Sequence, residues 1–186
     1  MAGTEQQSGQ IVMIKTILVP TDGSQHANNA VELAAEIAAK FGARLVVLQV
    51  LLHHHSTSEL RELCKSIGAP ATLVTKLDQL EEAMIEASAA SYGPVPLPVP
   101  SEILKPIGDV IVKKARAVVE AKGISRIKTE VVDGNPADCI MAAAEYEKAD
   151  MIVMGRRGLG NITGLLMGSV SHKVSHLADC ACVTVK

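Results

Sequence analysis

The chain has 186 residues, 48% of them hydrophobic, and a formal net charge of −2. Its length suits one domain, and its slightly acidic balance argues against nucleic-acid binding, which goes with a basic excess. With no Trp, one Phe and two Tyr, the core has to be built from aliphatic side chains and Met, and no apolar run reaches the roughly 20 residues of a membrane span.

The first part of the chain predicts a tail, a strand, a helix and a second strand. Residues 1–13 are mostly polar and lack the basic and apolar segments of a signal peptide, so we expect a disordered tail. The apolar, β-branched residues 15–20 are typical of a buried strand. Residues 26–42 have apolar positions at helical spacing, with Ser24 as the expected N-cap. The apolar run 43–52 predicts the second strand.

The alternation of strands and helices breaks in residues 53–105, which we interpret as an insertion after the second strand. Prolines alternate with other residues near its end, at Pro94, Pro96, Pro98 and Pro100. This spacing favours extended backbone and predicts a linker or surface arm. A helix then ends at Gly123, and Pro106 is expected to delay its start to about that residue.

The remaining residues continue the alternation. Asn135 and Pro136 form an N-cap and first-turn pair. Strand-like and helix-like runs follow one another in residues 127–134, 137–149, 150–155, 169–178 and 180–186. Such alternation predicts a single α/β domain with a parallel sheet and right-handed crossovers. In folds of this kind, ligands bind beyond the carboxyl ends of the strands, where the strand order reverses.

A glycine-rich segment follows the predicted fourth strand. Gly155, Gly158 and Gly168 form a G-x2-G-x9-G pattern, and Ser169 opens the last predicted helix. The first N–H groups of a helix favour an anion, so the segment is suited to a polyphosphate, with further hydroxyl donors at Ser169, Ser171 and Thr163. The pattern is neither a Walker A sequence nor the dinucleotide fingerprint. The alternative is a glycine loop that binds no ligand.

Asp22 lies at the carboxyl end of the first predicted strand, in the sequence VPTDGS. At that position a carboxylate can meet ribose hydroxyls or a metal ion held by phosphates. The alternative is a turn-forming Asp-Gly pair. The two loops support each other, because both follow strands of one small sheet.

With ILVPTDGS near its start and GRRGLGNITGLLMGSVSHKVSHLADCACVTV at its end, the chain resembles the universal stress protein family. The resemblance covers residues 15–52 and 101–186, and G-x2-G-x9-G-[ST] is that family's ATP-binding signature. It implies a Rossmann-like sheet of five parallel strands in the order 3-2-1-4-5, flanked by helices. The domain would span residues 14–186 with its insertion at about 53–105, and would form a homodimer through the last strand.

The resemblance also implies a nucleotide site made of Pro20, Thr21, Asp22, Val50, Met154, Gly155, Gly158, Gly168, Ser169 and Val170. The first three would flank adenine and ribose, and the backbone of Val50 would meet the adenine edge. Met154 and Gly155 would contact ribose. The other four would hold the phosphates of ATP, with Mg²⁺ bound to those phosphates.

Two features depart from the family pattern: the long insertion, and the start CACVTV of the last strand where many members have proline and valine.

Other candidate residues are explained more simply by structural roles than by ligand binding. Three histidines at 53–55 suit a solvated strand exit better than a metal site, and Arg156 with Arg157 is as much a solvated pair as a phosphate contact. Cys180 and Cys182 should share a face of the last strand in an apolar role.

The predicted function is that of an ATP-binding regulatory protein of the stress response, located in the cytoplasm because the cysteines form no disulfide or zinc pattern. It would not be an enzyme, since Asp22 is the only carboxylate placed at the site and no other catalytic group is evident. The alternatives are a slow ATP hydrolase and an AMP sensor that acts through a dimer surface.

Overall fold

The computed structural model describes residues 13–91, 98–160 and 166–186. All but the last residue of the expected tail, most of the proline-rich arm and Thr163 therefore lie outside the described residues. No helix in the described ranges is long and apolar enough to cross a membrane.

The sheet has five strands in the order β3-β2-β1-β4-β5, as the resemblance implied. All pairs are parallel. The strands are β1 (Thr16–Pro20), β2 (Arg44–Val50), β3 (Ile127–Val132), β4 (Met151–Gly155) and β5 (Ala181–Val185). The central strands are continuous apolar runs because both faces of the sheet are covered by helices.

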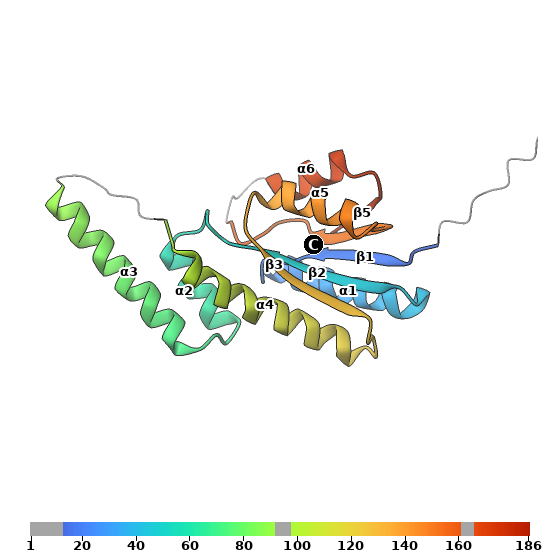
Figure 1. The fold of residues 1–186 in the computed structure, drawn as a ribbon, viewed down its shortest axis with the longest axis horizontal. Coiled ribbons are helices and arrows are strands. Elements are labelled where there is room, and N and C mark those ends of the chain that lie inside the picture. The colour runs from blue at the N-terminus through green and yellow to red at the C-terminus, as the bar shows by residue number, and fades with distance from the viewer. Residues whose placement is uncertain (1–12, 92–97, 161–165) are drawn as a thin grey trace, which may run out of the picture.

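Two pairs of helices enclose the sheet (Figure 1). One face is covered by α1 (Gln25–Phe41) and α4 (Ser101–Ala121), and the other by α5 (Pro136–Tyr146) and α6 (Ser169–Leu177). The expected N-cap of α1 is confirmed, since the Ser24 hydroxyl accepts a hydrogen bond from a backbone N–H of its first turn.

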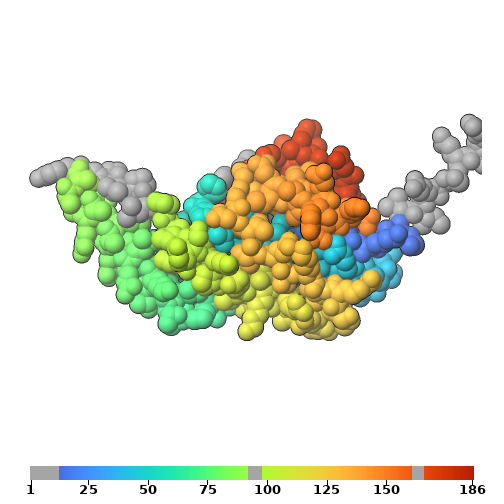
Figure 2. Space-filling model, in the orientation of Figure 1, coloured from blue at the N-terminus to red at the C-terminus, as the bar shows by residue number. Residues whose placement is uncertain are grey.

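The insertion adds a second, smaller core beside the sheet. It contains α2 (Thr57–Ser66) and α3 (Ala71–Ala90), which pack with the first half of α4 around leucine and isoleucine side chains. We call α2, α3 and residues 101–111 of α4 the helical lobe. Figure 2 shows this lobe, in green, extending from one side of the sheet body.

The expected start of α4 is wrong. The helix begins at Ser101, and Pro106 lies inside it. A proline there lacks the N–H that would bond to the preceding turn. That turn is held by packing instead, because Ile103, Leu104 and Ile107 are all buried in the core of the lobe. Packing likewise explains Val99, which is buried although the surrounding prolines predicted a surface arm.

Glu147 is a buried carboxylate of the body with two partly exposed basic partners. Its side chain is 5% exposed and accepts hydrogen bonds from Lys128, at 2.6 Å, and from Arg44. The hydrogen bond from Lys128 holds the pKa of this carboxyl below its ordinary value of 4.5, and that from Arg44 acts in the same sense against the effect of burial.

We expect the ionised Glu147 to stabilise the fold at neutral pH and to lose this effect in acid. A carboxyl with a lowered folded-state pKa contributes stability above its unfolded pKa of 4.5, and the contribution disappears as the pH falls through the folded value. Glu147→Gln should lower the free energy of unfolding by about 1 kcal/mol at pH 7. Urea titrations at several pH values measure the difference, which should shrink below pH 4.5. As a control, Glu145→Gln at an exposed position should change the free energy of unfolding little at pH 7.

Candidate functional site

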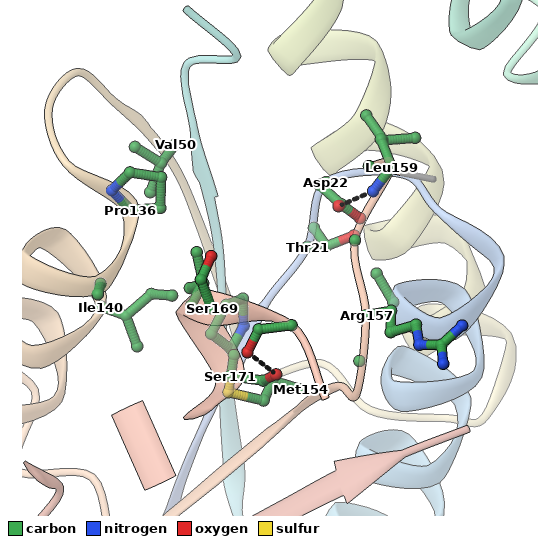
Figure 3. A pocket seen from close by; sticks show the side chains of 18 of the residues that line it. Thr21, Asp22, Val50, Pro136, Ile140, Met154, Arg157, Leu159, Ser169 and Ser171 are labelled. Atoms are coloured by element: carbon green, nitrogen blue, oxygen red, sulfur yellow. Dashed lines mark hydrogen bonds between the residues drawn. The ribbon is translucent and has the colours of Figure 1, made fainter. Parts of the chain in front are cut away.

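A cavity of about 550 Å³ lies at the carboxyl ends of β1, β2 and β4 (Figure 3). The strand order reverses between β1 and β4, so this is the crevice where open parallel sheets bind ligands. Its volume is in the usual range for small-molecule sites. All the residues predicted for the site line it: Pro20, Thr21, Asp22, Val50, Met154, Gly155, Gly158, Gly168, Ser169 and Val170.

Asp22 joins the turn after β1 to the glycine loop after β4. Its Oδ2 accepts a hydrogen bond from the Leu159 backbone N–H at 3.0 Å, and its Oδ1 accepts one from the Ser24 N–H at 2.9 Å. The second bond belongs to the local turn that the Asp-Gly sequence suggested. The first bond crosses the cavity edge, so Asp22 also positions the glycine loop (Figure 3).

Close approach explains two of the three glycines in the pattern. A Cβ at Gly158 would lie 2.4 Å from Asp22 Oδ2. A Cβ at Gly155 would lie 2.8 Å from the Ala27 backbone nitrogen and 2.9 Å from the His26 carbonyl carbon. At Gly168 the nearest atoms are 3.5 Å away, so steric contact alone does not require a glycine there.

The helices that begin around the cavity differ in whether a side chain caps their first turn. The first turn of α1 is capped by the Ser24 hydroxyl and that of α5 by the Asn135 side chain. The N-cap of α6 is Gly168, and no side chain of the described residues caps that helix. Its first residues line the cavity, so α6 presents hydrogen-bond donors and the positive end of its dipole to a ligand.

Ser171 corrects one expectation. We expected its hydroxyl to contact a ligand, but the side chain is buried and its Oγ lies 2.7 Å from the Arg156 carbonyl oxygen, to which it donates. The same carbonyl accepts the Gly168 N–H at 2.9 Å. The two bonds fix the start of α6 against the glycine loop, so Ser171 positions the helix rather than offering a free donor.

One wall of the cavity is apolar. Val50, Pro136, Ile140 and Met154 face it from two strands and from α5 (Figure 3). Sequence reasoning missed the α5 residues, although Pro136 opens the helix that follows β3 and could have been placed at the same edge. It also missed further lining residues: Leu52, His54, His55, Leu159, Met167 and Lys173.

The histidines at 53–55 and the arginine pair Arg156 and Arg157 were the other candidates from the sequence, and only some of them line the cavity. His53 Nε2 lies 2.8 Å from Asp133 Oδ1, and within the described ranges no group of three or more His, Cys, Asp or Glu side chains could hold a metal ion. Arg157 lines the cavity, but Figure 3 shows its guanidinium turned away from Ser169.

The cysteines are free and packed. Cys180 and Cys182 both contact the core between the sheet and α5, and burial raises the pKa of each thiol. Cys180 precedes β5 rather than lying in it. Both side chains pack against the same apolar core, as the sequence predicted.

The strand order and the cavity at its reversal point define a Rossmann-like α/β protein with a ligand site at the edge of its sheet. Residues 13–186 match the model of the Universal stress protein family, and the chain belongs to that family. A universal stress protein of Thermus aquaticus is 31% identical over 94% of this chain and 100% of its own length. One of Methanocaldococcus jannaschii is 30% identical over 94% of this chain and 83% of its own.

Solved structures share the fold. A universal stress protein in complex with cAMP superimposes with a TM-score of 0.57 at 24% identity, covering 92% of this chain and 96% of its own. The universal stress protein of Archaeoglobus fulgidus in complex with dAMP gives a TM-score of 0.56 at 18% identity, covering 94% and 99%. At these sequence identities the similarity shows a shared fold only.

Proposed function

We propose that this protein is an ATP-binding regulator of the stress response. The observation that carries the proposal is the start of α6, which lines the same cavity as an apolar wall and is not capped by a side chain of the described residues. An adenine ring needs apolar surface, and phosphates need N–H donors and positive potential. The cavity offers both kinds of surface at once.

The proposed pose follows from the lining. Adenine packs against the apolar wall, with its edge at the Val50 backbone. Ribose lies near Met154, Gly155 and Asp22, whose carboxylate has acceptor capacity left after its two backbone bonds. The phosphates lie at the start of α6 and the glycine loop, against Gly158, Gly168, Ser169 and Val170. Mg²⁺ bound to the phosphates would neutralise part of their charge.

The solved neighbours with cAMP and dAMP support an adenine nucleotide as the class of ligand. Both are monophosphates, and this favours AMP sensing as the second candidate. ATP remains our first choice because the glycine loop and the first turn of α6 both line the cavity, so both can meet phosphates.

A regulatory role fits the lining better than rapid catalysis does. Among the described lining residues Asp22 is the only carboxylate, and both of its oxygens already accept backbone N–H groups. These bonds tie Asp22 to the two loops, so we expect any ATP hydrolysis that uses this carboxylate as the general base to be slow.

We also propose a homodimer through β5 and a cytoplasmic location. Among the described strands β5 pairs only with β4, so its other edge is open to a second copy. The free cysteines fit a reducing compartment.

Calorimetric titration of the nucleotide-free protein with Mg-ATP, and separately with AMP, tests the proposal. We expect saturation by ATP near one nucleotide per chain, with slow turnover of the bound ATP. Binding of AMP alone would support the sensor, and no heat with either would refute nucleotide binding. Sedimentation velocity on the same sample checks the dimer.

A further inference from the structure

We infer that the helical lobe is the output element of the nucleotide site, so that ligand binding and the stability of α2 are coupled. The inference rests on the proposed function. It concerns the insertion, to which neither the ATP signature nor the proposed pose assigns a role.

Two leucines belong to the cavity and to the lobe at the same time. Leu52, just after β2, and Leu159, in the glycine loop, both line the cavity. Both also pack into the core of the lobe, where α2 contributes Leu60 and Leu63. A ligand that moves or orders either leucine therefore changes the packing of the lobe directly.

The turn after β1 makes a second connection. Gly23 follows Asp22 and packs so closely on the lobe that a Cβ there would lie 3.2 Å from Leu63 Cδ1 and 3.3 Å from Ile111 Cγ1. Asp22 in turn holds the Leu159 N–H. The carboxylate proposed to meet ribose thus links the glycine loop to a turn that rests on α2 and α4.

The start of α2 makes a third connection. His54 and His55 line the cavity, and Ser56 is the N-cap of α2. Glu59 and Ser56 form a reciprocal capping box, and His55 Nδ1 lies 3.6 Å from Glu59 Oε2. The first turn of α2 is therefore continuous with the cavity wall.

These contacts have a thermodynamic consequence. A nucleotide that orders the Asp22 turn and the Leu159 loop restricts the surfaces on which α2 packs, so local opening of α2 becomes less frequent. Coupling of this kind is reciprocal: whatever binds or loosens the lobe must change nucleotide affinity by the same factor.

Hydrogen exchange on the full chain, with and without saturating Mg-ATP, tests the coupling. We expect ATP to slow exchange in α6, which would touch the phosphates, and also in α2, which the proposed pose does not touch. Leu159→Ala should weaken ATP affinity by about fivefold or more. It should abolish the protection of α2 and leave that of α6.

Two variants control for truncation and for misfolding. Leu159→Met keeps the volume of the side chain and should behave like the wild type. Ile85→Ala removes an apolar side chain that is 64% exposed on α3 and should change neither affinity nor exchange in α2.

The outcomes separate the two proposals. If ATP binds and protects α6 while exchange in α2 is unchanged, the coupling is refuted and the proposed function stands. Wild-type affinity in a folded Leu159→Ala protein would also refute it. If neither heat nor α6 protection appears, the proposed function fails, and the coupling fails with it. Hydrogen exchange on the wild-type protein tests the coupling even if the Leu159→Ala protein does not fold.

Discussion

Gly158→Val is expected to lower ATP affinity by more than about 100-fold, a loss of about 3 kcal/mol, in a protein that still folds. The first added carbon alone would lie 2.4 Å from Asp22 Oδ2. Either the carboxylate or the glycine loop has to move, and the bond from the Leu159 N–H to Asp22 is lost. The proposed ribose and phosphate contacts are displaced together. Calorimetric titration with Mg-ATP measures the loss.

The same loop supplies a matched control. A Cβ at Gly160 would have no neighbour within 4 Å among the described residues, whereas one at Gly158 would lie 2.4 Å from Asp22 Oδ2. Gly160→Ala should therefore bind ATP much more tightly than Gly158→Ala, although both variants add one carbon to the same loop. Wild-type affinity in a folded Gly158→Val protein would contradict the assignment of the cavity.

Gly155→Ala is expected to lower the free energy of unfolding by about 3 kcal/mol, the upper part of the range for overpacking. The added Cβ would meet the backbone of α1 at His26 and Ala27, and the Arg157 carbonyl oxygen at 3.0 Å. Backbone atoms cannot rotate away as a side chain can, so β4 and the start of α1 must separate. Urea unfolding followed by circular dichroism measures the change.

Gly160→Ala also serves as the control for stability, because no atom of the residues that the structure describes lies within 4 Å of its added Cβ. Its free energy of unfolding should stay within about 0.5 kcal/mol of the wild type. Equal stabilities of Gly155→Ala and the wild type would mean that the end of β4 can move away from α1, contrary to the tight contact described above.

Much of the architecture could be predicted from local patterns. Apolar runs of strand length and helical spacing identified the strands and most helices of the body, since burial on both faces of a parallel sheet leaves that mark on a sequence. The strand order came from the resemblance to a known family, because periodicity carries no information about which strands are neighbours.

Local rules failed where long-range packing outweighs them. Pro106 predicted a late start for α4, but the buried side chains of the first turns hold the helix from Ser101. Ser171 looked like a free donor, and only the fold brings the Arg156 carbonyl to its hydroxyl. The helical lobe could not be predicted as a unit, because its core is assembled from segments on both sides of the proline-rich arm.

The sequence by itself determined the α/β class, the glycine pattern after β4 and the carboxylate after β1, because strand length, helix period and loop chemistry are local properties. The tertiary structure decided that Asp22 reaches Leu159, that α6 begins at the cavity without a side-chain cap from the described residues, and that the insertion shares Leu52 and Leu159 with the site. The Asp22–Leu159 contact alone joins segments 137 residues apart. The formation of these contacts depends on how the strands are ordered and how the helices pack on them, which no local pattern specifies.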